Sequence, residues 1–333
     1  MTKQTLEKNR KRGCVTSPSK NEGIDLDSIA YFNGKFVPLR EANINIMTHA
    51  FQYGTGIFEG IRGYWNENEK QMYIFCMKEH YERLSQNAKL LRLELDKSVD
   101  ELCKITVELM QKNKPNCDMY IRPNVYKSGI IVGPSLLNTN GKNPTAFSLC
   151  TMPMGEYVDI SKGLHVCVSS WTRVDDNAIP ARGKIQGSYV NTALAKTDAL
   201  LNGFDDAIVL DSRGHVCEGS AMNLFMVRNG KLITTPVTSN ILEGITRDTI
   251  IELASKELGI ETEIREVDRT ELYICDEVFF CGTGAQVSPI TKIDHRDIGN
   301  GKIGPISKQL QEIYFDIVKG KNPKYKKWCT PVF

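Results

Sequence analysis

The segment from Ser169 to Leu201 constrains this chain more than any other part of its sequence. It carries one isolated lysine, Lys184, in a turn rich in small residues that leads into a stretch of helical character. Upstream, apolar residues at every second position from 164 to 168 alternate with more polar ones, which is typical of a half-buried strand. The segment therefore predicts a strand, a crowded turn that holds the lysine, and a helix.

Two interpretations of Lys184 follow from that setting. Lysines in loops are most often solvated surface charges. A lysine in a crowded turn is instead a partly desolvated amine, and desolvation lowers its pKa and makes it a nucleophile toward an aldehyde. The rest of the sequence decides between the two.

The bulk composition is that of an ordinary globular protein. The 333 residues leave room for two domains, and the net charge of +2 argues against an extended nucleic-acid surface. No apolar run reaches the roughly 18–20 residues that span a membrane. The ten cysteines form no C-x-x-C pair and no secretory signal precedes them, which favours a cytoplasmic protein. The five histidines are scattered, so we expect no metal site.

The pattern of elements predicts an α/β (α+β) protein of two domains. We expect a disordered basic tail over 1–28, a small α/β domain over 29–152, a linker over 153–160 and a large domain over 161–333. Hairpin signals mix with helices without a repeating βαβ pattern, which argues against a doubly wound sheet. Strands are expected at 30–32, 35–37, 73–76, 119–126, 145–152, 164–170, 207–210, 223–227, 231–234 and 277–281. Helices are expected at 78–91, from Ser98 with Glu101 as a capping box, and at 189–202, 246–258 and 305–319.

Two glycine-rich or helix-starting motifs are candidate anion sites. In GTGIFEGIRGYW, glycines crowd Arg62, which would let its guanidinium hold a phosphate; a buried structural arginine fits equally well. In LEGITRDTI, Gly244, Ile245 and Thr246 open a helix whose free N–H groups attract an anion; plain N-capping by Thr246 is the alternative.

Two further motifs have the character of ligand contacts. In FFCGTGAQVSP, Thr283, Gly284 and Ala285 allow a ligand to approach the backbone closely, although an ordinary tight turn would look the same. In HVCEGSAMNLF, Glu218 lies in an apolar, strand-like setting, where a carboxylate stays charged only beside a cationic partner. A protonated ring nitrogen or a core arginine would serve.

Pyridoxal phosphate is one compound that needs all of these groups, because its aldehyde takes a lysine, its phosphate takes donors and its ring nitrogen takes a carboxylate. The chain resembles a branched-chain-amino-acid aminotransferase of the fold-type IV family of pyridoxal-phosphate enzymes. The resemblance runs from about residue 31 to 315. It rests on the strings MTHAFQYGTGIFEGIRGY, YIRP, SSWTR…GKIQGSYVNTALAKTDAL, EGSAMNLF, LEGITRD and CGTGAQVSP.

The resemblance implies a role for each matching residue. Lys184 would bond to the cofactor aldehyde and shuttle the proton, Glu218 would face the ring nitrogen, and Tyr189 would face the phenolic oxygen. The remaining cofactor contacts would form the phosphate cup: Arg62, Ile245, Thr246 and Thr283. The substrate contacts would be Tyr53, Phe58, Tyr120, Arg122, Met154, Tyr157, Gly284 and Ala285.

The implied reaction is transfer of the amino group of L-leucine, L-isoleucine or L-valine to 2-oxoglutarate, with ping-pong kinetics. The resemblance also implies a site between the two domains, closed by a loop of the second subunit of a homodimer. Three departures bear on the substrate. Ala221 and Met222 stand where the family has glycine and glutamate, Met154 stands where a relative has tryptophan, and the loop over 127–138 lacks the usual G-x-G-V. They keep open a D-amino-acid or amine transaminase, or an aminodeoxychorismate lyase.

Overall fold

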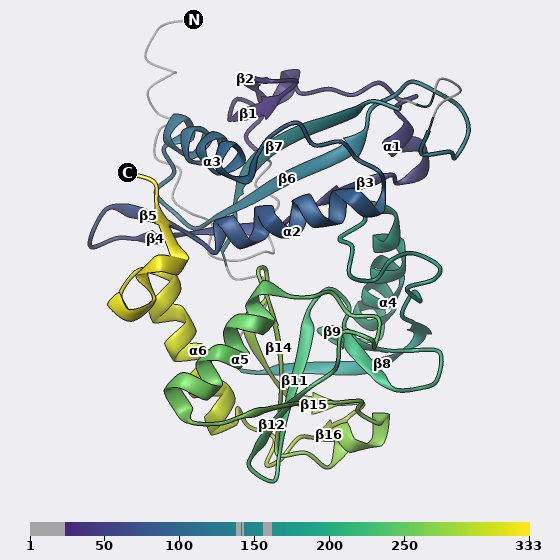
Figure 1. Cartoon of the computed structure of the whole chain (residues 1–333). Helices are drawn as coiled ribbons and strands as arrows, with labels where there is room; N and C mark the ends of the chain where they lie inside the picture. Colours follow the sequence, from purple (N-terminus) through teal and green to yellow (C-terminus); the bar gives the residue numbers. More distant parts are fainter. Residues whose placement is uncertain (1–23, 138–140, 142, 156–161) are drawn as a thin grey trace, which may run out of the picture.

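The computed structural model describes residues 24–137, 141, 143–155 and 162–333. Within these ranges the chain forms two β-sheets, each with helices packed against it, and the sheets lie in separate halves of the molecule (Figure 1). The expected mixed α/β class with two domains agrees with this architecture. The expected tail lies mostly outside the described residues, since positions 1–23 are not among them, and most of the expected linker does too.

The first half is built on an antiparallel sheet of eight strands in the described chain, in the order β17-β5-β4-β6-β7-β1-β2, with β3 paired to β6. The strands are β1 (Ile29–Phe32), β2 (Lys35–Pro38), β3 (Gly56–Phe58), β4 (Ile61–Asn66), β5 (Gln71–Phe75), β6 (Met119–Lys127), β7 (Thr145–Pro153) and β17 (Cys329–Pro331). The helices of this half are α1 (His49–Tyr53), α2 (Met77–Leu90) and α3 (Val99–Asn113).

The second half is built on a mixed sheet of nine strands in the described chain, in the order β10-β9-β8-β15-β14-β11-β12-β13, with β16 paired to β15. Its strands are β8 (Leu164–Thr172), β9 (Asp206–Leu210), β10 (Val216–Gly219), β11 (Asn223–Arg228), β12 (Lys231–Thr234), β13 (Thr262–Ile264), β14 (Glu277–Gly282), β15 (Gln286–Ile293) and β16 (Arg296–Asp297). Its helices are α4 (Tyr189–Leu201), α5 (Ile245–Leu258) and α6 (Pro305–Val318). Helix α4 packs on β8 and β9, α5 packs on β14, and α6 packs on β14 and β15.

The central strands of the second sheet are buried on both faces. In β14, Val278 and Phe280 enter one apolar core while Phe279 and Cys281 enter another, because successive side chains point to opposite faces. Strand β11 divides its apolar residues between the same two cores. Continuous apolar runs of this kind are expected where helices or loops cover both sides of a sheet.

The helix ends follow the local signals in the sequence. Ser98 and Glu101 form the expected capping box of α3, and Gly259 ends α5 in the left-handed region at φ 66°. Helix α5 begins at Ile245, and its N-cap is Gly244, which offers no side chain. The interpretation of Thr246 as a plain N-cap is therefore wrong, and its hydroxyl is not used to cap the helix.

The C-terminal residues return to the first half of the molecule. Strand β17 pairs with β5, in the register Cys329↔Phe75, after the chain has passed through α6 (Figure 1). The sequence placed these residues in the large domain, but they extend the sheet of the small one. The two halves are therefore joined by the connection after β7 and by this second crossing.

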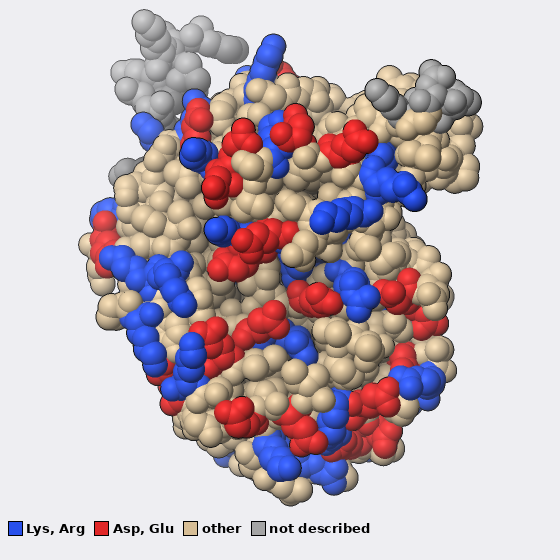
Figure 2. Space-filling view, viewed as in Figure 1, with Lys and Arg blue, Asp and Glu red and all other residues tan. Residues whose placement is uncertain are grey.

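The surface carries no extended patch of one charge on the face shown in Figure 2, where the acidic and basic side chains of the described residues alternate. In the part of the chain that the structure describes, no helix has the length and apolarity to cross a bilayer. Within the same ranges, no three His, Cys, Asp or Glu side chains gather into a group that would hold a metal ion.

Candidate active site

A cavity of about 270 Å³ lies between the two halves of the molecule. Phe58, Arg83, Tyr120 and Arg122 line it from the first half. Most of the remaining lining comes from the second half: Arg173, Lys184, Ser188, Tyr189, Thr192, Glu218, Ser220, Ala221, Met222, Gly244, Ile245, Thr246, Thr283, Gly284 and Ala285. Segments far apart in the sequence thus converge on one space, including all four motifs of the large domain that the sequence singled out.

Lys184 lies in the turn between β8 and α4 and faces this cavity. Its Nζ donates to the hydroxyl of Tyr189 at 2.9 Å and lies 5.1 Å from the centre of the Phe58 ring. The lysine backbone is fixed as well, because its carbonyl accepts from the Phe58 N–H at 3.1 Å. The amine is therefore held by residues of both halves, which excludes the solvated surface lysine.

The electrostatic setting of Lys184 differs from the expectation. Burial by itself lowers the pKa of the amine, but Tyr189 and Glu59 outweigh it, so the pKa is raised above its ordinary value. The predicted lowering is therefore wrong for the cofactor-free protein. An expectation based on desolvation of the turn alone leaves out two neighbours, the Tyr189 hydroxyl and the Glu59 carboxylate, and the second of these is distant in sequence.

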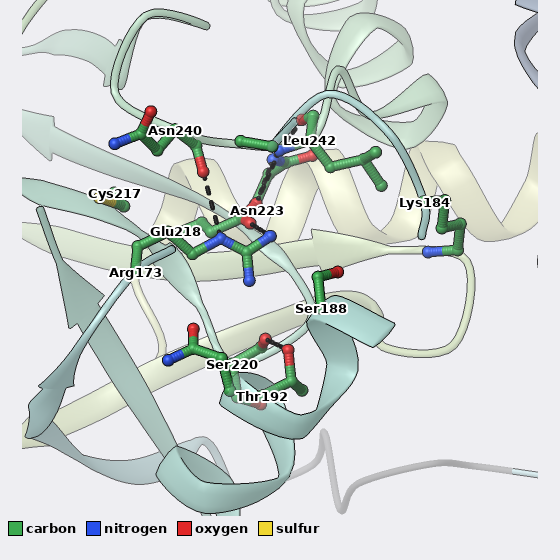
Figure 3. A network of polar contacts seen from close by, with 12 residues as sticks. Arg173, Lys184, Ser188, Thr192, Cys217, Glu218, Ser220, Asn223, Asn240 and Leu242 are labelled. Atoms are coloured by element: carbon green, nitrogen blue, oxygen red, sulfur yellow. Dashed lines mark hydrogen bonds and ion pairs between the residues drawn. The ribbon is translucent and has the colours of Figure 1, made fainter. Parts of the chain in front are cut away.

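Glu218 lines the cavity from β10 and is almost fully buried; Figure 3 shows its neighbours. Its Oε1 pairs with Nη2 of Arg173 at 2.9 Å, and its Oε2 accepts from Asn223 at 2.9 Å and from the Leu242 N–H at 3.4 Å. Burial raises the pKa of Glu218 in spite of Arg173. Of the two cationic partners that the sequence suggested, the core arginine is present.

The N-terminus of α5 forms a second wall. Gly244, Ile245 and Thr246 line the cavity there, and the first N–H groups of a helix have no partner within it. Gly244 is required, since a Cβ at this position would lie 1.9 Å from Oδ1 of Asn223. Unpaired N–H groups, the helix dipole and the Thr246 hydroxyl together fit a phosphate or another anion.

Arg62, a predicted phosphate contact, does not line the cavity. Its guanidinium is buried and donates to the carbonyls of Met154, Gly155 and Gly284 at 3.0, 2.8 and 3.3 Å. Arg62 therefore ties the connection after β7 to the back of the turn between β14 and β15. Of the two interpretations left open by the sequence, the structural arginine is correct.

Arg83, on α2, is the cation that lines the cavity on the side of Thr246 and that sequence reasoning missed. Its Nε and Nη2 each lie 2.7 Å from an oxygen of the buried Glu59, and Nη1 donates to the Glu243 carbonyl at 2.6 Å. His80, one helical turn earlier, donates its Nδ1 proton to the same carboxylate at 2.8 Å. Their spacing of three positions places His80 and Arg83 on one face of the helix, and this could have been noticed in the sequence. The neighbouring residues do not indicate, however, that this face meets Glu59.

Tyr120 and Arg122 form the opposite end of the cavity. Nη2 of Arg122 donates to the Tyr120 hydroxyl at 3.0 Å, and the guanidinium stacks over the Phe58 ring at 4.3 Å. Among the described residues no carboxylate pairs with Arg122, and its Nε has no hydrogen-bond partner. A partly desolvated guanidinium in this state is a ready site for a carboxylate ligand.

The other predicted substrate contacts divide into three groups. Met154, Gly284 and Ala285 line the cavity as expected. Tyr157 lies outside the described residues. Tyr53 does not line this cavity: it is 38% exposed, and its hydroxyl accepts from the Gly133 N–H at 2.9 Å.

Comparisons with known proteins agree with this arrangement. The amino-transferase class IV family model matches residues 56–293. A probable branched-chain-amino-acid aminotransferase of Aquifex aeolicus is 53% identical over 304 residues, which cover 91% of this chain and 96% of that protein.

Solved structures are similar over the same length. The branched-chain amino acid aminotransferase of Thermobaculum terrenum in its PLP form has a TM-score of 0.87 at 40% identity, over 93% of this chain and 99% of that one. The branched-chain aminotransferase of the archaeon Thermoproteus uzoniensis with norvaline has a TM-score of 0.86 at 38% identity, over 92% and 99%. The shared fold, the family match and the cavity around Lys184 lead to one conclusion: this chain belongs to the class IV aminotransferases, in the group of the branched-chain-amino-acid aminotransferases.

Proposed function

We propose that this protein transfers the amino group of branched-chain L-amino acids to 2-oxoglutarate with pyridoxal phosphate. The observation that carries the proposal is a single cavity lined by Lys184, by the buried carboxylate of Glu218 and by the N-terminus of α5, whose free N–H groups suit an anion. The family membership supports it, since the relatives compared above are named for this activity.

The residues present fit the cofactor. Thr246, Ile245, Thr283 and Arg83 would hold the phosphate, with Arg83 in the place that the resemblance assigned to Arg62. Glu218 would face the ring nitrogen and Tyr189 the phenolic oxygen. When bound, the cofactor supplies an aldehyde that condenses with amines and an electron-withdrawing ring that stabilises negative charge at Cα.

Lys184 is the residue whose Nζ would bond to the cofactor aldehyde. As a free amine, Nζ could also take up the Cα proton of the substrate and give it back, as general base and acid. Tyr189, at 2.9 Å, holds Nζ on this path. Because the raised pKa makes the neutral amine the minor form, cofactor capture is expected to quicken as pH rises.

The substrate end explains how two unlike substrates fit one site. Phe58, Met154 and Met222 would take a branched apolar side chain, and methionines adapt to irregular shapes. Arg122, which has no acidic partner in the described chain, would take the distal carboxylate of glutamate or 2-oxoglutarate. The backbone at Gly284 and Ala285, braced from behind by Arg62, would receive the α-carboxylate.

The test is the visible absorbance of the cofactor-loaded protein before and after addition of L-leucine alone. We expect the band of the Lys184-bound cofactor to disappear, and 2-oxoglutarate to restore it. D-leucine and isobutylamine are the matched controls and should leave the band unchanged. A response to D-leucine or to an amine, or pyruvate release from aminodeoxychorismate, would replace the substrate assignment. A protein that never takes up cofactor would overturn the mechanism.

We further propose that the protein acts as a homodimer. The segment before α1 and the loop after β6 share an antiparallel bridge, Thr48↔Ile130, and expose apolar side chains, among them Ile46 at 73% and Val132 at 81%. Exposed apolar patches of this kind mark interfaces. Tyr53 lies in the same region, where a second subunit would bring it to a partner's cavity. Sedimentation of the protein and of Ile46→Glu tests this, because the variant should shift toward monomer; a monomeric parent protein would contradict it.

We also assign the protein to the cytoplasm. The cysteines at Cys76, Cys217, Cys275, Cys281 and Cys329 are buried free thiols, which suit a reducing compartment. Fractionation of cells with an antibody against the protein tests this assignment, and recovery outside the cytosolic fraction would contradict it.

A further inference from the structure

The carboxylate of Glu218 is held unequally at its two oxygens (Figure 3). Oε2 accepts from two neutral donors, the amide of Asn223 and the N–H of Leu242. Oε1 has a single partner among the described residues, the guanidinium of Arg173. The charged group that touches this carboxylate therefore acts on one oxygen, and that oxygen can accept one more donor.

Arg173 is fixed in this position by the backbone. It follows the last residue of β8, its N–H donates to the Leu210 carbonyl at 2.8 Å, and its Nε donates to the Asn240 carbonyl at 3.1 Å. Its side chain is 12% exposed and lines the cavity. The Leu210 carbonyl thus fixes the backbone of Arg173, and the Asn240 carbonyl holds its guanidinium beside Glu218.

We propose that Arg173 is a positioning residue that keeps the proton of the Glu218 hydrogen bond on the ring nitrogen of the bound cofactor rather than on Glu218. The inference rests on the role of Glu218 in the proposed function. It adds a residue that sets where the proton lies and that does not itself contact the reacting atoms.

The physical reason is the position of the positive charge. One proton shared by Glu218 and a ring nitrogen has two places, giving either an anion beside a cation or two neutral groups. A buried carboxylate favours the neutral pair, since burial penalises charge. The guanidinium contacts the carboxylate at 2.9 Å and would lie farther from a cation hydrogen-bonded to the same oxygen, so its net effect favours the charged pair.

The position of this proton determines how strongly the cofactor ring withdraws electrons. A protonated ring nitrogen withdraws electrons from the reacting carbon, and a neutral one does so less. Without Arg173 the cofactor would still bind, because the phosphate and Lys184 contacts remain. Its ring nitrogen would be neutral, and Cα deprotonation would slow.

The experiment measures directly whether the ring nitrogen carries the proton. The wild type and the variants Arg173→Met and Arg173→Lys are loaded with pyridoxal phosphate labelled with ¹⁵N in the ring, and the ¹⁵N chemical shift is measured. We expect a protonated nitrogen in the wild type and in Arg173→Lys, and a shift toward the unprotonated position in Arg173→Met. Arg213→Met is the matched control, because that arginine is 57% exposed and pairs with Asp211 and Glu266 away from the cavity.

A protonated nitrogen in Arg173→Met would overturn the inference. If Arg173→Met does not fold, Arg173→Lys and the affinity of the wild type for a cofactor analogue with carbon in place of the ring nitrogen remain informative. We expect Arg173→Lys to weaken pyridoxal phosphate by about three-fold, because the ammonium keeps the charge but not the fixed geometry of the guanidinium, and to leave the carbon analogue unchanged. Equal weakening of both ligands would contradict the inference.

These outcomes are separable from failure of the proposed function. A wild-type protein that binds no cofactor refutes the proposed function. A wild-type ring nitrogen that is unprotonated refutes the role of Glu218. A protonated wild type with an unaffected Arg173→Met, or equal weakening of both ligands in Arg173→Lys, refutes the role of Arg173.

Discussion

Glu59 and Glu218 are both buried carboxylates paired with an arginine at the wall of one cavity, but their pKa values move in opposite directions. Burial alone would raise the pKa of Glu59, but Arg83, through two hydrogen bonds of 2.7 Å, and His80, through a third, outweigh burial and lower it. Glu218 meets Arg173 through one nitrogen, and burial prevails and raises its pKa.

The difference separates a structural pair from a functional one. The Glu59 pair is complete, so its carboxylate has its charge fully compensated, and it presents Arg83 to an anion. In the Glu218 pair, one carboxylate oxygen can accept a further hydrogen bond. Burial disfavours the ionised form of Glu218 until a second cation lies beside it. We expect variants at the two sites to affect different properties.

The largest effect is expected at the residue that lies between the two pairs. Lys184→Ala should lower kcat by about 10⁴-fold or more, because it removes both the attachment point of the cofactor and the general base. The measurement is the leucine–2-oxoglutarate rate at saturating cofactor. Lys256→Ala, on the exposed face of α5, is the control and should retain the parent rate. Retention of about a tenth of the activity in Lys184→Ala would show that another base does the work.

Neutralising the two carboxylates should separate stability from catalysis. Glu59→Gln leaves Arg83 buried beside a neutral group, and breaking a buried pair in this way costs about 3–5 kcal/mol of the free energy of unfolding. Glu218→Gln should cost much less, because the fold already disfavours its charge, but it should lower kcat about 100-fold. Urea unfolding of the cofactor-free proteins gives the change in the free energy of unfolding, and steady-state rates give the change in kcat. Equal losses of stability in the two variants would contradict the distinction between a structural and a functional pair.

The two arginines of the first half should differ in the same manner. Arg83→Lys replaces a bidentate fork with a point charge, and we expect it to weaken cofactor binding about 10-fold. Arg62→Lys should leave the cofactor dissociation constant within a factor of about 3, since its donors serve backbone carbonyls and its side chain does not line the cavity. Titration of the apoproteins with pyridoxal phosphate measures both. A larger loss in Arg62→Lys would restore the assignment made from the sequence.

The smallest effect is expected in the acid dependence of stability. Because the pKa of Glu59 is lower in the folded than in the unfolded protein, its ionised form stabilises the fold at any pH above the ordinary value of 4.5. This contribution is lost as the pH falls from 4.5 toward the folded pKa. Glu59→Gln should therefore show a shallower loss of stability than the parent protein below pH 4.5. Identical slopes in urea titrations across that range would refute the lowered pKa.

Local chemistry made most of the elements predictable. The apolar alternation before Lys184, the capping box at Ser98 and the glycine after α5 each depend on neighbours a few residues away. The expected helices and strands were found with ends that differ by a few residues. Short elements without such signals, such as α1 and β13, were not expected, because pairing with distant strands or loops produces them.

The candidate site was predictable only where a motif carries its own geometry. Lys184, Glu218 and the start of α5 each sit in a local pattern that fixes how the backbone presents them. Arg62 was misassigned because glycines around an arginine indicate that it is buried but not what it faces. Its contact with Gly284 spans 222 positions of the chain.

The sequence by itself determined the fold class, the lysine, the buried carboxylate and the helix whose N-terminus opens on the cavity. These follow from periodicity, turn chemistry and helix ends, which act over short distances along the chain. The tertiary structure alone decided which arginine lies beside the start of α5, which sheet holds the C-terminal strand and in which direction the pKa of Lys184 moves. Those outcomes depend on burial, charges and close contacts, several of them between residues far apart in sequence, and Coulomb interactions and burial depend on distance in space rather than on position in the chain.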